Sequence, residues 1–179
     1  LTAPGEYFID TVNAHLYMRP NGDVPPGEVL VSLLQGPIVD MRGAERMYTT
    51  WQGVVFEASK NHLVTVVGCN DVAFKDCQFR NSGGWGLLLG GNRNLVDACE
   101  FQQLGKGGIY VSGGNRHTLT SAGTVIQNCE IHHFGRLFWT WQPAILVDSV
   151  SDFPNRDDAC GITIQHNEIH HAPHSAIVF

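Results

Sequence analysis

Two similar segments near the end of the chain carry many of the side chains that could do chemistry. CEIHHFGR (129–136) and NEIHHAPH (167–174) each contain a glutamate, two adjacent histidines and a further arginine or histidine. Imidazoles and carboxylates can exchange protons, bind metal ions and hydrogen-bond to sugar hydroxyls. Which of these they do depends on whether the two segments lie side by side in the fold.

The two segments belong to a repeat of five blocks. The blocks begin at Val54, Cys77, Cys99, Cys129 and Asn167. Each has an apolar residue two positions after its start and ends in a strand-like triplet, such as Ile109–Val111. Short β-rich runs separated by Gly and Asn predict strands with tight corners, and a period of this length is typical of a solenoid. We therefore predict an all-β fold, a parallel β-helix of about five coils.

Stacked coils place equivalent residues about 4.8 Å apart, so that each repeat position becomes a column. One predicted inward column comprises Phe56, Phe79, Phe101, Ile131 and Ile169. A second comprises Cys77, Cys99, Cys129 and Asn167. We expect these three cysteines to be buried, reduced packing residues. The chain has no Cys-x-x-Cys spacing, which leaves a zinc site built on cysteine without support.

The same arithmetic gathers histidine, arginine and tryptophan near one rim of the coils. His132 should stack on His170, and His133 on His171. A six-residue insertion in the fourth block brings two tryptophans to the neighbouring loop. Aromatic faces cover the apolar patches of a pyranose, while Arg and His bind its polar groups. The predicted substrate-binding residues are His132, His170, Arg136, His174, Trp139 and Trp141; the alternative is a structural imidazole ladder with the tryptophans as loop core.

Glutamates form a further column, comprising Glu100, Glu130 and Glu168. Crowded like charges raise a carboxyl pKa, as an acid catalyst requires. Glu130 and Glu168 are the candidate catalytic residues. The alternative is a solvated face on which Arg80 or Lys75 offsets the charge.

No cofactor and no metal site are predicted, although four stacked imidazoles could hold zinc or copper and remain an alternative. The spacing His166-x3-His170-x3-His174 would align ligands on a helix. This segment, however, has the pattern of a strand and a corner.

Several stretches together resemble a known group of proteins. They are PGEYFID (4–10), LYMRP (16–20), GGIYVSGGNRHTL (107–119), NCEIHHFGRLFWTWQPAI (128–145) and HNEIHHAPHSAIVF (166–179). They are similar to the right-handed parallel β-helix proteins of carbohydrate metabolism, and more narrowly to bacterial β-helix glycoside hydrolases of the α-L-fucosidase and xylanase kind and their uncharacterised relatives.

This resemblance implies a right-handed β-helix and a glycoside hydrolase that acts on a plant or microbial polysaccharide, secreted or periplasmic in a bacterium. It also implies catalytic carboxylates partly beyond Phe179, so that an oligosaccharide or polysaccharide and the remaining coils of a longer protein would be partners. The alternatives are a non-catalytic glycan-binding or structural β-helix module and a polysaccharide lyase. A lyase is less favoured because lysine is scarce.

Length and charge agree with a single β-helix domain of 179 residues. The net charge of −6 gives no basic surface for nucleic acid or an anionic membrane, and no apolar run is long enough to span one. Residues 1–37 do not repeat; their runs EYFID, HLYM and EVLVSLL predict a small N-terminal β cap or connector. The coils are expected over residues 38–179, truncated at the C-terminus.

Overall fold

The computed structural model describes residues 1–20, 22, 30–43, 47–148 and 159–179. The chain divides into two compact units, Leu1–Val31 and Ser32–Phe179. The first contains an antiparallel hairpin of β1 (Tyr7–Asp10) and β2 (His15–Met18). The third predicted run, EVLVSLL, forms no strand in its described part, residues 30–34. Its side chains are largely solvated, with Leu33 81% exposed, and residues 30–34 belong to no sheet in the described part of the chain.

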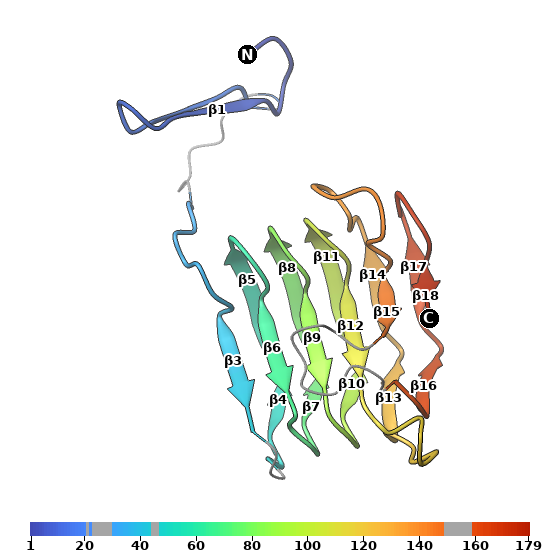
Figure 1. The fold of residues 1–179 in the computed structure, drawn as a ribbon. Helices are drawn as coiled ribbons and strands as arrows, with labels where there is room; N and C mark the ends of the chain where they lie inside the picture. The colour runs from blue at the N-terminus through green and yellow to red at the C-terminus, as the bar shows by residue number, and fades with distance from the viewer. Residues whose placement is uncertain (21, 23–29, 44–46, 149–158) are drawn as a thin grey trace. The chain divides into compact units, whose positions relative to one another are not determined.

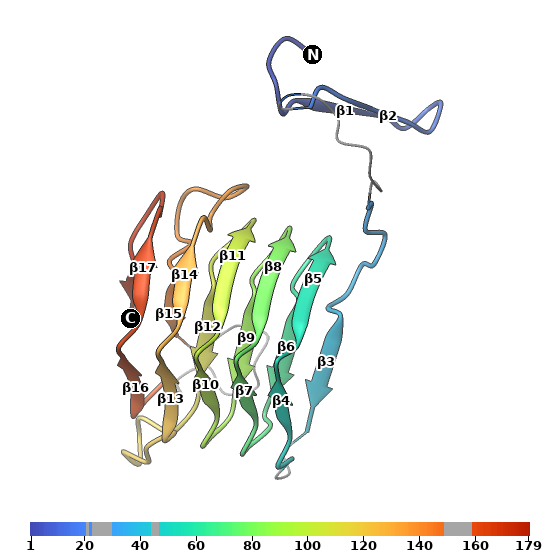
Figure 2. The ribbon, with the colours of Figure 1, turned by 180° about the vertical axis from the view of Figure 1, so that it is seen from behind.

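The second unit is a stack of coils built from three parallel sheets (Figures 1 and 2). Sheet 1 contains β4 (Thr50–Gln52), β7 (Ala73–Lys75), β10 (Leu95–Asp97), β13 (Thr124–Gln127) and β16 (Ile162–Gln165). Sheet 2 contains β5 (Val55–Ser59), β8 (Gln78–Ser82), β11 (Glu100–Leu104), β14 (Glu130–His132) and β17 (Glu168–His170). Sheet 3 contains β3 (Val39–Arg42), β6 (Val64–Val67), β9 (Leu87–Gly90), β12 (Ile109–Ser112), β15 (Ile145–Val147) and β18 (Ile177–Val178).

From β4 onward, consecutive strands of the chain lie in sheets 1, 2 and 3 in turn. From β6 onward, each strand pairs in parallel with the strand three positions earlier in the chain, as β11 does with β8 and β12 with β9. The described residues therefore form five three-strand coils, preceded by β3. This confirms the predicted all-β parallel β-helix. Among the described residues, no helix is long and apolar enough to cross a membrane.

The predicted apolar column forms the centre of the core. The five residues pair in register from β5 to β17, and the rings of Phe79 and Phe101 stack with centroids 4.5 Å apart and planes at 2°. Phe79, Phe101 and Ile131 have no solvent exposure. Burying each such side chain contributes about 1.5–3 kcal/mol relative to leaving it in water, so this column is a major source of stability.

The predicted cysteine column also points inward. Cys77, Cys99 and Cys129 are buried, and none of the chain's five cysteines forms a disulfide. A hydrogen bond with the Cys129 thiol and burial raise the pKa of Cys99, whereas the same hydrogen bond lowers the pKa of Cys129. Asn167 ends the column: its Oδ1 accepts from the Cys129 N–H at 2.9 Å, and its Nδ2 donates to the Ile126 carbonyl at 3.0 Å.

The corner between sheets 1 and 2 is a stack of left-handed residues that the sequence pattern did not reveal. The residue just before each block start has a positive φ. These residues are Gly53, Asp76, Ala98, Asn128 and His166, with φ between 52° and 64°. Left-handed backbone costs an alanine about 1–2 kcal/mol, so the inter-coil hydrogen bonds must impose this conformation where the side chain does not favour it.

Truncating the centre of the apolar column should destabilise the coils strongly. Phe101→Ala removes a fully buried ring that stacks on Phe79, and should lower the free energy of unfolding by about 3–5 kcal/mol. Urea unfolding followed by circular dichroism measures the change. Val55→Ala is the matched control, because Val55 lies on the same sheet but is 46% exposed. Equal unfolding midpoints for the two variants would contradict the inward column.

Thiol alkylation should separate Cys160 from the other four cysteines. Cys160 is half-buried, whereas the others are buried, and desolvation raises the pKa of the Cys69 and Cys77 thiols. Iodoacetamide should therefore modify Cys160 first in the folded protein and the others only after unfolding. Mass spectrometry of the digested protein identifies the modified sites. A Cys77–Cys99 disulfide in freshly isolated protein would show that the column is packed differently.

Candidate functional site

The outer face of sheet 2 carries two adjacent columns of polar side chains. Alternate residues of a strand face opposite sides, so the residues flanking the buried apolar column point outward. The first column contains Gln78, Glu100, Glu130 and Glu168, in register on β8, β11, β14 and β17. The second contains Glu57, Arg80, Gln102, His132 and His170, on β5 to β17. Parallel pairing thus brings carboxylates and imidazoles next to one another.

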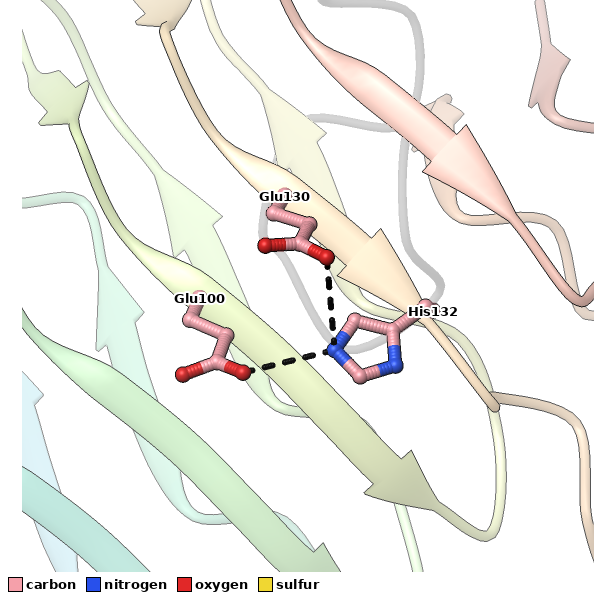
Figure 3. A group of neighbouring side chains, drawn as sticks. All are labelled: Glu100, Glu130 and His132. Carbon is pink, nitrogen blue, oxygen red and sulfur yellow. Dashed lines mark hydrogen bonds and ion pairs between the residues drawn. The ribbon is translucent and has the colours of Figure 1, made fainter.

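His132 lies between two carboxylates (Figure 3). Its Nε2 is 3.3 Å from Glu100 Oε1 and 3.9 Å from Glu130 Oε1. One ligand atom from each of the three residues lies within 4.8 Å of the others. The His132 side chain is 13% exposed and that of Glu130 49%, so the cluster is shielded on the imidazole side and open to solvent above Glu130.

The same arrangement recurs one coil further along. His170 Nε2 is 3.1 Å from Glu130 Oε1 and 3.9 Å from Glu168 Oε1. Glu130 therefore contacts an imidazole on its own strand and one on the next. At the other end of the face Arg80 binds Glu57 at 2.6 Å, and this bond is the main reason that the pKa of Arg80 is raised. The alternative in which Arg80 offsets the glutamate column is thus met mainly at Glu57.

Four imidazoles stack in two pairs at the edge of the face. His132 and His170 have ring centroids 4.9 Å apart, and His133 and His171 4.5 Å apart. The Nδ1 atoms of His132 and His133 are 2.7 Å apart, a hydrogen bond in which one nitrogen donates and the other accepts. Desolvation, followed by the charges of the other three histidines and Arg136, lowers the pKa of His133. The ladder therefore favours neutral imidazole at that position.

The loop that follows β14 carries Trp139 and Trp141 and is called the tryptophan loop here. It is attached to the preceding coil. The Arg136 N–H donates to the Leu104 carbonyl at 3.1 Å, and Lys106 Nζ lies 5.2 Å from the centroid of the Phe138 ring. Trp139 and Trp141 are 72% and 74% exposed. The loop thus presents two indoles to solvent from a firmly attached base.

The predicted binding residues fall into two neighbouring groups. His132 and His170 lie within the outer columns of sheet 2. The loop group contains Trp139, whose Nε1–H donates to the Arg136 carbonyl, and Trp141, whose ring centroid lies 6.5 Å from that of His174. The positive charge of Arg136 in the loop group is one of the causes that lower the pKa of His133, which is hydrogen-bonded to His132. The two groups are therefore close enough to interact electrostatically.

The two candidate catalytic carboxylates differ in their surroundings. Glu130 is held by His132 and His170, whereas the Glu168 side chain is 77% exposed and its Oε1 lies 3.9 Å from His170 Nε2. Glu100, in register with both, is better enclosed than Glu168. Gln102 also belongs to the cluster, since its Nε2 donates to Glu100 Oε1 at 2.9 Å. Its position two residues after Glu100 on a strand was the available signal.

Comparison with protein families identifies the chain at the level of its fold. The family model described as a right-handed β-helix region matches residues 49–179. The chain belongs to this right-handed β-helix family. The match spans all five coils and confirms the expected handedness. No curated protein and no solved structure matches the chain significantly.

In this right-handed β-helix the cluster can act chemically in three ways. Its carboxylates can exchange protons with the imidazoles that they contact. Its oxygen and nitrogen atoms can hydrogen-bond to a polar ligand. Glu100, Glu130 and His132 are also close enough together to hold a cation.

Proposed function

We propose that this β-helix binds an oligosaccharide across the tryptophan loop and the outer face of sheet 2, as part of a glycoside hydrolase. The observation that carries the proposal is the pair of exposed indoles of Trp139 and Trp141, next to a face of carboxylates and imidazoles. Large exposed aromatic rings beside polar groups are typical of a surface that covers the apolar side of a sugar ring and binds its hydroxyls.

The setting of the two indoles supports a recognition role over packing. Core tryptophans are enclosed, as Trp85 is here at 5% exposure. The loop base, in contrast, is well packed: Phe134 is 2% exposed, and a Cβ added at Gly135 would lie 2.7 Å from Pro173 Cγ. A rigid base that holds exposed rings loses little conformational entropy when a sugar binds.

Glu100 and Glu130 are the carboxylates that we propose for hydrolysis. One oxygen of each lies within 4.8 Å of the other, and such close carboxyl groups suit a retaining mechanism, which needs a separation of about 5–5.5 Å, better than an inverting one. Under this proposal one carboxyl is the acid and base, and the other is the nucleophile. This departs from the sequence-based pair, Glu130 and Glu168, because Glu168 is far more exposed.

A non-catalytic glycan-binding module is the second candidate. It is favoured by the recurrence of the Glu–His contact on successive coils, at 3.3 Å for His132 and 3.1 Å for His170. A contact that repeats with the coil can serve the stability of the ladder alone. Turnover distinguishes the two candidates.

Binding should depend on the loop and its polar neighbours. Trp139→Ala and Trp141→Ala should each weaken oligosaccharide binding about tenfold or more, because each removes an exposed stacking surface. Arg136→Ala and His174→Ala should each cost about 1–3 kcal/mol by leaving a sugar group unpaired. A glycan array identifies a ligand, and isothermal titration calorimetry measures its affinity for each variant.

Arg93→Ala serves as the control for these binding measurements. Arg93 is also exposed at a coil corner, but it binds Asp71 at 2.8 Å and lies outside the proposed surface. Its loss should leave affinity unchanged. If the loop variants bind as tightly as the unchanged chain, the proposed binding surface is wrong.

Hydrolysis should require Glu130. Glu130→Gln keeps the shape of the side chain but removes its proton chemistry, so release of reducing ends from the bound oligosaccharide should fall by at least about 100-fold. Glu57→Gln is the control on the same face, since Glu57 pairs with Arg80 away from the cluster. Turnover that is equally fast with Glu130→Gln would contradict the role of Glu130, and binding without turnover by the unchanged chain would favour the module.

A further inference from the structure

We propose that Glu100, Glu130 and His132 form a binding site for one divalent transition-metal ion, with zinc as the favoured ion. The site uses atoms of β11 and β14 only, and the inference does not depend on the proposed binding of sugars. It differs from the four-imidazole site considered from the sequence, because two of its three ligands are carboxylates.

The separations of the three ligand atoms suit a single ion. Zinc binds imidazole nitrogen at about 2.0–2.1 Å and carboxylate oxygen at about 2.0–2.2 Å, so tetrahedral ligands lie about 3.4 Å apart. His132 Nε2 lies 3.3 Å from Glu100 Oε1 and 3.9 Å from Glu130 Oε1. The two carboxylate oxygens lie within 4.8 Å of each other, so an ion at the centre of this group would draw them together. A fourth position remains for water on the solvent side, where Glu130 is half exposed.

The local charge also favours a cation. Glu100 and Glu130 are in register on adjacent strands and bring two negative charges to one point. Their ion pairs are with the imidazoles of His132 and His170, whereas Arg80 binds Glu57 at 2.6 Å. A proton on His132 could neutralise only one of the two carboxylates. A divalent ion neutralises both and satisfies all three groups at once.

Outer hydrogen bonds already orient two of the three ligands. Gln102 Nε2 donates to Glu100 Oε1 at 2.9 Å, which leaves that oxygen a second lone pair for an ion. His132 Nδ1 is 2.7 Å from His133 Nδ1. If His132 carries its proton on Nδ1 and donates it to His133, its Nε2 lone pair points to the two carboxylates. Such partners fix the tautomer and orientation of metal-binding histidines.

The stacking of the histidines argues against a site shared by all four imidazoles. The rings of His132 and His170 are nearly parallel, at 12°, with centroids 4.9 Å apart. A metal ion lies in the plane of the ring that binds it, and one ion cannot lie in two parallel planes this far apart. His170 is therefore excluded as a partner of His132 for the same ion. Its own contact with Glu130 only helps to position that carboxylate.

The ligand types select the class of ion. Calcium and magnesium prefer sites made wholly of oxygen ligands, whereas imidazole suits zinc and its neighbours in the transition series. Zinc also accepts three protein ligands and an open position without demanding a fixed geometry. One nitrogen with two oxygens therefore favours zinc over calcium.

Zinc titration of the purified, chelator-treated chain tests the site. Competition with a chromophoric chelator should show one ion bound per chain. His132→Ala and Glu100→Gln should each weaken binding by at least about 100-fold, and Gln102→Ala by about 10–100-fold as an outer partner. The control is His171→Ala, which should bind zinc as tightly as the unchanged chain does. Circular dichroism verifies that every variant is folded.

Cobalt(II) provides a second readout that identifies the ligands. Bound at this site, it should give visible ligand-field bands without the near-ultraviolet charge-transfer band of a thiolate ligand. That band would assign the ion to a cysteine and overturn the proposal. The proposal would also be overturned if the chain bound no zinc. Equal losses of zinc affinity in His132→Ala and His171→Ala would overturn it as well, because they would indicate a site made of imidazoles.

The sugar measurements are made with a chelator present. The proposed sugar binding can therefore prove wrong while the metal site is confirmed, and the metal site can prove wrong while sugar binding is confirmed. The two proposals meet at one point. Zinc would occupy both carboxylates proposed for hydrolysis, so it should suppress turnover in the unchanged chain.

Discussion

The hydrogen bonding of each coil to the next is the constraint on which the rest of this structure depends. Parallel strands in unbroken register place every residue directly beside its counterpart in the neighbouring coil. A side chain at one repeat position therefore always meets the side chain at the same position one coil away. Inside the coils this arrangement is favourable, because stacked rings such as Phe79 and Phe101 and stacked thiols fill a narrow core.

On the outside the same constraint creates a problem of charge. A glutamate repeated at one position would form a column of like charges about 4.8 Å apart, which is unfavourable. The chain meets this with the neighbouring column, in which His132 and His170 lie beside Glu100 and Glu130. Carboxylates and imidazoles are thus forced together by the geometry of stacking. The chemistry available on this face therefore follows from the same stacking that builds the core.

Register was the part of this structure that the sequence could predict, because counting residues from one block to the next requires no knowledge of side-chain contacts. The apolar column, the cysteine column and the pairing of His132 with His170 all follow from it. The contacts within the outer face did not follow: repeat arithmetic could not say that Arg80 would bind Glu57, or that Gln102 would bind Glu100. Those depend on rotamers. The left-handed corner at Ala98 was also hidden, since the hydrogen bonds between coils impose it against the preference of alanine.

The outer face of sheet 2 also explains why chemistry is expected in the third to fifth coils. In the first two coils Arg80 and Glu57 neutralise each other in an ion pair on this face. The guanidinium of Arg80 remains protonated at any physiological pH. From β11 onward glutamine and imidazole replace that cation. An imidazole can release its proton, and the carboxylates beside it then lack a permanent counter-charge. One repeat position therefore carries a guanidinium–carboxylate ion pair on β5 and β8 and imidazoles that contact carboxylates on β14 and β17, and the tryptophan loop extends from the coil that contains His132.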